Sequence, residues 1–538
     1  MTHRITPSRR ALLQGLAAFG AAAPLALNLA AVGRAAAQSA GAGSGYRALV
    51  CVFLQGGNDA HNMLMATDPG SFAQYTTARQ SGAEPINLMP AGTAPVAIGG
   101  VSPVTKRTIT TTDMPEHWGG VLAIAPATAQ LVPPANATTS QPTTRTFAVH
   151  PFLTGAQGLF AAGRLAAIAN VGTLLAPLTK ADYQKPGPAT QIPQRLFSHS
   201  DQQSAWQSGQ VDGSATGWGG LMADTFQALG GGEVDFSAIT TAGNTAFLNG
   251  QSARSFRINY AANKATAQTI TLTATTGRYN NSANFLDELR ASLVETHLSA
   301  GQSSDMVSDY AAAVTRSVAL STVFDNGLTS AAAAEAAIPN PPAFTDPIGG
   351  KVVDNPLADQ LQAVVETAAA QAQLGVTRQV FFVQLGGFDT HDGENPRQGL
   401  LMAQIDHALS YFDAAIAAAG MADKITAFTA SDFNRTFATN GTGTDHAWGS
   451  HHFVLGAAVK GGDLYGPYPT VGIDKAASGS TPAFTNPDAA SNAYIPTTSV
   501  ETYLATMATW MGVTAAQMPG IFPRLAGFPV QNMGFMRA

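Results

Sequence analysis

Charged side chains are scarce in this chain of 538 residues. Lys, Arg, Asp and Glu make up only 12% of it, with 28 basic against 34 acidic side chains and a formal net charge of −6. No basic run stands out beyond the N-terminus, which argues against nucleic acid as a partner, because phosphate backbones are bound through clustered Lys and Arg. Hydrophobic residues make up 45%, enough for the core of a large folded domain.

Cysteine and several catalytic signatures are also missing. Cys51 is the single cysteine, so neither an intramolecular disulfide nor a thiolate metal site is expected. The chain has no Gly-x-Ser-x-Gly, no His-Glu-x-x-His, no Gly-x-x-x-x-Gly-Lys-Ser/Thr, and no Gly-x-Gly-x-x-Gly after its first apolar run. These absences disfavour a standard serine hydrolase and a nucleotide-dependent oxidoreductase.

Residues 1–37 are typical of an export signal. A twin-arginine pattern, SRRALL (8–13), precedes 19 uncharged residues and a small-residue cleavage site at 35–37. A transmembrane anchor is the alternative, because 19 residues just span a bilayer, but Pro24, Asn28 and many Gly and Ala residues weaken it. We expect twin-arginine export to the periplasm or the medium, with no stable membrane anchor after cleavage. The mature chain would carry 24 basic against 34 acidic side chains, a net charge of −10.

Apolar runs alternate with helical patterns along the rest of the chain. Strand-like runs lie within 46–59, 166–175, 378–391, 425–436 and 453–462, and helical spacing lies within 150–165, 282–335, 355–374, 399–419 and 500–513. This alternation predicts an α/β fold with a doubly wound, mostly parallel sheet flanked by helices. We expect a single domain over 46–538 with an insertion around 233–345.

Polar residues follow three of the predicted strands and precede another. They are Asn58 and Asp59, Asp389 and His391, Asp432 with Asn434 and Arg435, and a loop with Asp445, His446, His451 and His452. Because the carboxyl ends of parallel strands share one edge of a sheet, we expect a joint site there. Carboxylate and imidazole are usual ligands of zinc, manganese or iron. The alternative is that each aspartate only caps a helix or a turn.

Several segments together resemble the DUF1501 family of exported bacterial proteins. They are FLQGGNDAHNML, LGGFDTHDG, SDFNRTFATNGTGTDHAWGSHHFVLGAAVKGG, RLAAIANVG, SHSDQQSAW and the twin-arginine leader. The resemblance covers nearly all of the chain after the leader. That family is similar to the alkaline phosphatase and sulfatase superfamily, which has an α/β sheet and two metal sites. The resemblance therefore implies an alkaline phosphatase-like fold with insertions.

The superfamily pattern implies metal ligands at individual positions. Its first strand ends in an aspartate, which Asp59 matches, with Asn58 as the near alternative. A later strand supplies the pair matched by Asp389 and His391, which are closer in sequence than in many relatives. The resemblance also implies Asp432, followed by Asn434, as a carboxylate ligand and His446 as a last histidine, with His451 as a further ligand or a supporting group. One or two zinc, manganese or iron ions are implied.

The superfamily nucleophile is a Ser, a Thr or a modified Cys at a helix N-terminus, where the positive helix end favours an oxyanion. Ser198 fits this position, since it precedes His199 and the helical DQQSAW, although a plain helix cap is the alternative. Thr173, which follows ANVG, is the competing candidate. Formylglycine chemistry is excluded, because no cysteine lies in a Cys-x-Pro-x-Arg setting.

Arg435 is the candidate for a guanidinium fork that grips phosphate or sulfate oxygens, or else it pairs with Asp432. We therefore predict an exported, metal-dependent hydrolase of small anionic phosphate or sulfate esters, in which Ser198 or metal-activated water attacks. The rival is a binding or assembly protein that keeps the fold with one structural ion or none. Convergence of all four polar clusters within about 5 Å would favour a dinuclear site, and scattered clusters would favour the rival.

Overall fold

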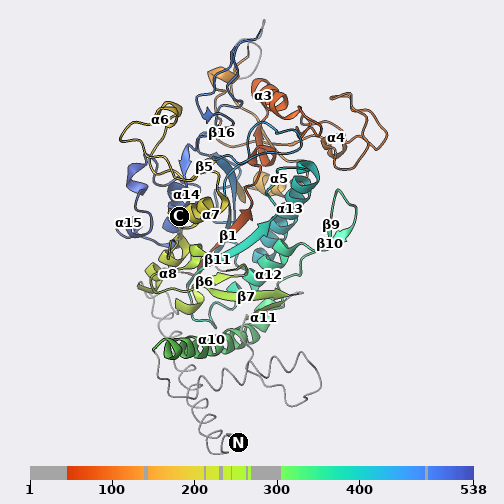
Figure 1. Ribbon diagram of the computed structural model, residues 1–538. Coiled ribbons are helices and arrows are strands. Elements are labelled where there is room, and N and C mark those ends of the chain that lie inside the picture. Colours follow the sequence, from red (N-terminus) through yellow and green to blue (C-terminus); the bar gives the residue numbers. More distant parts are fainter. Residues whose placement is uncertain are drawn as a thin grey trace, which may run out of the picture.

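The computed structural model describes residues 45–138, 143–210, 214–228, 234–243, 245–261, 264–267, 305–478 and 483–537. Its centre is one large mixed sheet with helices on both faces (Figure 1). The predicted leader at residues 1–37 lies outside the described residues. Within the described ranges, no helix is both long enough and apolar enough to cross a membrane.

The central sheet contains ten described strands: β1 (Arg47–Gln55), β5 (Leu165–Gly172), β6 (Ala238–Thr240), β7 (Phe256–Ala261), β8 (Lys264–Ala267), β11 (Arg378–Gly386), β12 (Ile425–Ser431), β13 (Ser450–Leu455), β14 (Leu464–Tyr465) and β17 (Thr498–Ser499). Their order is β14-β5-β13-β12-β1-β11-β6-β7-β8, and β17 also pairs with β5. The antiparallel pairs are β12 with β13, β13 with β5 and β7 with β8. The predicted α/β fold with a mostly parallel sheet is confirmed.

The helices and shorter strands surround this sheet. The main helices are α3 (Pro69–Arg79), α5 (Thr154–Ala161), α7 (His199–Ser208), α8 (Trp218–Ala228), α10 (Asp305–Ser330), α12 (Pro356–Ala369), α13 (Glu394–Ala418) and α14 (Val500–Met511). Shorter helices are α2 (Ala60–Met63), α4 (Pro115–Trp118), α6 (Lys180–Gln184), α11 (Ala332–Glu335), α15 (Met518–Ile521), η1 (Pro134–Asn136), η2 (Val234–Phe236), η3 (Ala246–Leu248) and η4 (Leu525–Gly527). Small sheets pair β2 (Leu64–Ala66), β4 (Phe147–Val149) and β3 (Leu122–Ile124), β9 (Phe344–Thr345) with β10 (Val352–Val353), and β15 (Ala489–Ala490) with β16 (Ala493–Tyr494).

Strand β1 is central because both of its faces are apolar. Its alternate residues enter two different buried clusters: Ala48, Val50, Val52 and Leu54 one of them, and Leu49, Cys51 and Phe53 the other. A strand buried on both faces needs parallel neighbours covered by crossover helices. β1 accordingly pairs in parallel with β11 on one side and with β12 on the other.

Each face of the sheet is covered by helices with local start and stop signals. α5, α12 and α13 pack on one face, and α8 and α14 pack on the other (Figure 1). α12 begins after Asn355, whose side chain accepts from the N–H of Leu357, and has Pro356 as its first residue. α14 begins after Ser499, which caps the N–H of Thr502. The helices predicted within 355–374 and 500–513 therefore exist, with shorter bounds.

The last predicted strand starts earlier than expected and runs in the opposite direction. β13 is antiparallel to both β12 and β5. His451 and His452 therefore lie inside this strand, fully buried, rather than in the loop before it. Because β13 is antiparallel to β12, its first residue lies at the carboxyl edge of the parallel strands. The loop with Asp445 and His446 consequently ends at the edge where a site was expected.

The segment predicted as an insertion, around 233–345, adds strands to the central sheet. β6 pairs in parallel with β11, β7 pairs with β6, and β7 and β8 form an antiparallel pair. Of the helical pattern predicted over 282–335, residues 282–304 lie outside the described residues. The rest forms α10 and α11. The described part of the insertion thus continues the sheet beyond β11.

A close backbone approach at Gly56 is testable. Gly56 has φ +115°, and a Cβ there would lie 2.5 Å from the backbone N of Asp389. Gly92 also has a positive φ, +80°, but its Cβ would meet nothing within 4 Å. Both Gly→Ala variants carry a left-handed backbone cost of about 1–2 kcal/mol. Only Gly56→Ala adds an overlap that costs about 1–3 kcal/mol.

We therefore expect Gly56→Ala to lower Tm by clearly more than Gly92→Ala in thermal unfolding followed by circular dichroism. Equal losses of Tm in the two variants would contradict a close contact between the end of β1 and the loop that carries Asp389.

Candidate metal centre

A cluster of polar side chains lies at the carboxyl edge of the central sheet, beside α7. Asp389 and His391 follow β11, Asp432 follows β12, and His446 lies in the loop before β13. His199 is the first residue of α7. The strand ends that the sequence places far apart therefore meet at one edge, as parallel strands require.

Three histidine nitrogens surround one oxygen, Oδ1 of Asp389. This oxygen lies 3.4 Å from Nε2 of His199, 3.2 Å from Nε2 of His391 and 3.4 Å from Nε2 of His446. Nε2 of His391 is 2.9 Å from Nε2 of His446. Among the described residues, one group fits a metal ion by the spacing of its ligand atoms, which lie within 4.8 Å of one another: His199, Asp389 and His446. His391 points its Nε2 at the same oxygen and is a fourth candidate.

The opposite nitrogen of each imidazole ring faces an oxygen acceptor. The Nδ1 contacts are His199 to Asp432 Oδ2 at 2.7 Å, His391 to Asp445 Oδ1 at 3.1 Å and His446 to the carbonyl of Phe197 at 2.6 Å. A neutral histidine that donates its Nδ1–H keeps a lone pair on Nε2. The tautomers assigned from these partners direct three lone pairs toward Asp389.

This arrangement fits a divalent cation. Lone pairs that point at one another and at a carboxylate repel unless a proton or a cation lies between them. The buried Nε2 of His199 has no hydrogen-bond partner among the described residues. Imidazole and carboxylate are usual zinc ligands, and an oxygen acceptor on the other ring nitrogen is their usual outer partner.

Burial and neighbouring charges set the protonation of the group. The hydrogen bond to Asp432 raises the pKa of His199, although burial opposes this. Burial lowers the pKa of His446, so this ring is neutral at pH 7. Burial raises the pKa of Asp389, but Arg435 and the nearby histidines outweigh it and hold that pKa below its ordinary value. Asp389 is therefore ionised at neutral pH.

Arg435 holds the loops of this edge together. It is fully buried, and its guanidinium donates to four carbonyl oxygens: Gly57 at 2.9 Å, Gly56 at 2.5 Å, Phe388 at 3.0 Å and Thr444 at 3.3 Å. It also donates to Oδ1 of Asp389. With its N–H groups turned toward these oxygens, Arg435 does not present the open fork that the sequence predicted for phosphate or sulfate.

Strained backbone precedes α7 and positions His446. Arg195 and Phe197 have φ values of +49° and +75°, a region that bulky residues rarely adopt. The turn presents the carbonyl of Phe197 to His446. On the other side, the ring of Phe433 packs against His199 and His446, with centroids 4.8 and 4.6 Å away.

Asp59, predicted as the first ligand, lies in a separate buried ion cluster. Its carboxylate oxygens accept from Arg79 at 2.5 and 2.9 Å, and one of them also accepts from the N–H of His61. Glu394 lies 3.8 Å from the same guanidinium. The neighbouring Asn58 accepts from Gln398 at 3.1 Å. Neither Asp59 nor Asn58 belongs to the metal group, so the four predicted clusters do not all converge. Of the one or two ions that the resemblance implied, the described residues offer a candidate group for one.

His451 is also apart from the group. Its Nδ1 accepts from the backbone N–H of Asn170 at 3.1 Å, and its ring stacks on Tyr468. Burial lowers the pKa of His451 to about 3. His451 is therefore a neutral residue of the protein core.

The two nucleophile candidates have different partners. Ser198 precedes the first residue of α7, and its Oγ donates to Oδ2 of Asp201 at 2.7 Å. Thr173 follows β5, and its Oγ1 donates to the amide oxygen of Gln202 at 2.6 Å. Ser198 thus has a carboxylate beside its hydroxyl, and Thr173 has a neutral amide.

The sequence did not indicate His199 as a ligand, and it did not indicate Asp445 as the hydrogen-bond partner of His391. In the sequence, His199 stands out only as the residue after the candidate nucleophile Ser198. Its position at the start of α7, immediately after a predicted loop, was a usable signal, because a first-turn residue projects toward the end of the helix. The role of Asp445 had no separate signal in the sequence.

Comparison with known proteins identifies the family. The family described as "Protein of unknown function (DUF1501)" matches residues 46–517. The chain belongs to this family. This confirms the resemblance seen in the sequence, while the family's own description leaves the function of this DUF1501 chain open.

Other comparisons add little to the site of this DUF1501 protein. The crystal structure of Ps i-CgsB in complex with k-i-k-neocarrahexaose matches with 9% sequence identity, covering 68% of this chain and 69% of that chain, at a TM-score of 0.26. A TM-score this low carries no argument about function. No curated protein matches the chain.

The buried carboxylate behind His199 should tune metal affinity. Asp432 has no exposed surface and also accepts from Gln203 at 2.9 Å, whereas the side chain of Asp445 behind His391 is 59% exposed. We expect Asp432→Asn to weaken zinc binding about 10–100-fold, as for other outer-shell carboxylates. Asp445→Asn should have a clearly smaller effect, because water replaces its contact. Competition with a chromophoric chelator measures both, and equal effects would contradict the role of Asp432.

The ion cluster at Asp59 predicts a pH dependence of stability. Burial and the charge of Asp59 raise the pKa of Glu394 well above its ordinary value. The folded chain therefore keeps this proton at a pH where the unfolded chain has lost it. The stability contribution of Glu394 is full below the ordinary pKa of about 4.3 and falls by up to about 1.4 kcal/mol per pH unit as pH rises toward the folded pKa.

We expect Glu394→Gln to raise Tm, with a larger gain at pH 8 than at pH 5, because Gln removes the cost of holding a proton. Glu84→Gln, at an exposed glutamate, is the matched control. Thermal unfolding at the two pH values checks this, and a gain that does not change with pH would contradict the assignment.

Proposed function

We propose that this protein is an exported, metal-dependent hydrolase of small phosphate or sulfate esters. The observation that carries the proposal is the convergence of three histidine Nε2 atoms on Oδ1 of Asp389, each with its Nδ1 held by an oxygen. Two further features support it. The group lies at the carboxyl edge of a mostly parallel sheet, where such folds place ligands, and its side chains are 22–49% exposed, which leaves room for a substrate.

Different residues of the chain would hold the metal ion and attack the ester. His199, Asp389 and His446, with His391 as the fourth candidate, would hold a zinc, manganese or iron ion. Such an ion polarises an ester oxygen and neutralises charge that develops on it. Asp432 fixes the ring of His199 from behind, and the buried Arg435 fixes Asp389.

Ser198 remains our proposed nucleophile. Its hydroxyl donates to Asp201, so a carboxylate is in place to accept the proton when Oγ attacks phosphorus or sulfur. The bond to the ester's alcohol breaks, the alcohol leaves with a proton, and water then hydrolyses the seryl ester. Ser198 directly precedes the candidate ligand His199 in the chain. Thr173 lacks an adjacent base and is therefore the weaker candidate. The substrate's anionic oxygens would face the ion, because Arg435 is occupied.

The number of protein ligands separates this proposal from its rival. Structural zinc sites are closed by four protein ligands, whereas catalytic sites have three and keep one position open. Whether His391 ligates the ion distinguishes the two kinds of site. Its Nε2 lies 2.9 Å from that of His446, within reach of the same ion, whereas its 46% exposed side chain is not held in place by burial. If His391 is a fourth ligand, a binding or assembly protein with one structural ion is the better interpretation.

Metal content and ester hydrolysis test the proposal together. We expect about one zinc, manganese or iron ion per chain by mass spectrometry of protein exported by its own leader, since one candidate group is found among the described residues. His199→Ala and Asp389→Ala should lose the ion. His117→Ala, at a histidine bonded to the carbonyl of Val96, is the matched control and should keep it.

The loaded protein should hydrolyse p-nitrophenyl phosphate or p-nitrophenyl sulfate, and Ser198→Ala should lower kcat at least 100-fold without loss of the ion. Absence of a stoichiometric ion in the wild type contradicts the metal centre. A bound ion with no hydrolysis, together with loss of the ion in His391→Ala, supports the binding protein.

A further inference from the structure

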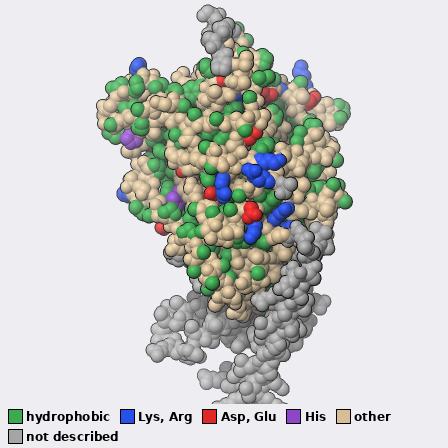
Figure 2. All heavy atoms as spheres, turned by 180° about the vertical axis from the view of Figure 1, so that it is seen from behind, with side chains coloured by type: hydrophobic (Ala, Val, Ile, Leu, Met, Phe, Trp, Pro, Cys, Tyr) green, Lys and Arg blue, Asp and Glu red, His purple; other side chains and the backbone are tan. Residues whose placement is uncertain are grey.

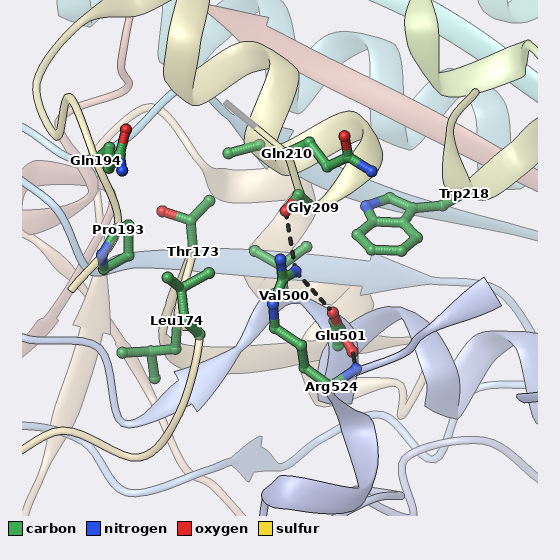
Figure 3. Close-up of a pocket in the computed structure, with 12 residues that line it drawn as sticks. Thr173, Leu174, Pro193, Gln194, Gly209, Gln210, Trp218, Val500, Glu501 and Arg524 are labelled. Atoms are coloured by element: carbon green, nitrogen blue, oxygen red, sulfur yellow. Dashed lines mark hydrogen bonds and ion pairs between the residues drawn. The ribbon is translucent and has the colours of Figure 1, made fainter. Parts of the chain in front are cut away.

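A cavity lies near the C-terminal end of α7, whereas the metal group lies at the N-terminal end of this helix. It has a volume of about 440 Å³ and is lined by residues that follow β5, by the end of α7, by α8 and by the segments around α14 and η4 (Figure 3). Its volume is in the range of small-molecule sites. No residue of the metal group lines it. Thr173, the weaker nucleophile candidate, is among the lining residues, whereas the metal group and Ser198 are not. A ligand of this cavity would therefore be bound apart from the metal group.

Arg524 is the single cation among the described residues that line this cavity. Its Nη1 donates to the carbonyl of Gly209 at 2.9 Å and lies 3.5 Å from Oε1 of Glu501. Figure 3 shows the guanidinium between these two partners and Thr173 and Leu174. The Nε–H and the remaining Nη2–H groups have no hydrogen-bond partner among the described residues, and the side chain is 34% exposed. This edge of the guanidinium has the fork geometry that binds a carboxylate with two parallel hydrogen bonds.

Glu501 does not cancel this cation. Its Oε2 accepts from the backbone N–H of Arg524 at 2.9 Å, so the carboxyl group is committed to the turn that leads into η4. Its side chain is only 3% exposed, and burial raises its pKa above the ordinary value. The carboxyl group therefore lies behind the guanidinium and leaves the open edge of Arg524 to a ligand.

The rest of the lining is mainly apolar. Leu174 and Pro193 lie on one side of the cavity and Trp218 lies on the other (Figure 3). Leu175 and Val500 also line it. The indole N–H of Trp218 donates to the carbonyl of Trp206, which fixes the ring in the wall of the cavity, where the residue is 1% exposed. Burial of an apolar body against these side chains would favour binding, because it removes apolar surface from water.

These features together select a ligand class. One guanidinium, whose Nη1 already lies 3.5 Å from Oε1 of Glu501, matches a single negative charge better than the two charges of a phosphate monoester. We propose that this cavity is a second binding site that takes an organic monocarboxylate with an apolar or aromatic body. The carboxylate pairs with the open edge of Arg524, and the body lies against Leu174, Pro193 and Trp218.

Isothermal titration calorimetry of the full chain with three matched probes tests this. The probes are 4-phenylbutyrate, the uncharged 4-phenylbutan-1-ol and 4-phenylbutyl phosphate. We expect 4-phenylbutyrate to bind with one site per chain and at least tenfold more tightly than either of the others. Equal affinity for the acid and the alcohol, or no binding of the acid at 10 mM, overturns the proposal. Tighter binding of the phosphate overturns the carboxylate assignment.

Variants place the ligand in the cavity. Arg524→Gln should weaken binding of 4-phenylbutyrate about tenfold or more, because a charge-assisted hydrogen-bond pair is lost, and should leave binding of the alcohol unchanged. Arg537→Gln, at an arginine bonded to the carbonyls of Ala457 and Val459, is the matched control. Unchanged binding in a folded Arg524→Gln overturns the site.

If Arg524→Gln does not fold, a fluorescence measurement on folded protein decides instead. A para-brominated 4-phenylbutyrate should quench tryptophan emission in the wild type and quench clearly less in Trp218→Phe. Equal quenching in the two overturns the placement. Binding that survives in Asp389→Ala, which removes the metal group, is also expected, and it separates this proposal from the proposed hydrolase.

Discussion

The buried guanidinium of Arg435 is the constraint on which the carboxyl edge of the sheet depends. It joins the end of β1, the loop after β11 and the loop before β13, segments that are far apart in the sequence. A buried arginine deprived of its acceptors costs several kcal/mol, so these loops must keep their carbonyls in place. Because Asp389 contacts the same guanidinium, the charge that fixes the loops also fixes the centre of the metal group.

Aspartates at this one edge have different roles because their surroundings differ. Asp59 is fully buried and bonded twice to Arg79, which leaves it no freedom to ligate an ion. Asp389 is half exposed, and only one of its oxygens is shared with Arg435 and the histidines. Asp432 lies between these cases, since it is buried but turned toward His199. All three are aspartates that follow parallel strands of the central sheet. Their hydrogen-bond partners decide whether each one supports the structure or is free to ligate an ion.

The fold was predictable because the strongest signals were local. β1, β11 and β12 are apolar on both faces, and this pattern alone predicts central parallel strands with helices on either side. The direction of β13 was not predictable, because its short apolar part, Phe453 to Leu455, has the same pattern in a parallel and an antiparallel strand. That direction depends on how the connection from β12 turns back along the same edge. It also explains why His451 and His452 are core residues, although they follow a loop that reaches the site.

The candidate site was predictable in its ligand types and only partly in its members. The sequence indicated Asp389, His391 and His446, because they follow or precede apolar strands. His199 was missed because attention fell on its neighbour: a serine before a helix is a candidate nucleophile or a common cap, and the histidine after it received no role of its own. What distinguishes His199 is the carboxylate of Asp432 behind its ring, which comes from a strand more than 200 residues later. Metal ligation by histidine requires that the outward nitrogen be held as well as the inward one. A pair of residues so far apart in the chain becomes a ligand and its support only when the sheet has brought β12 beside the start of α7.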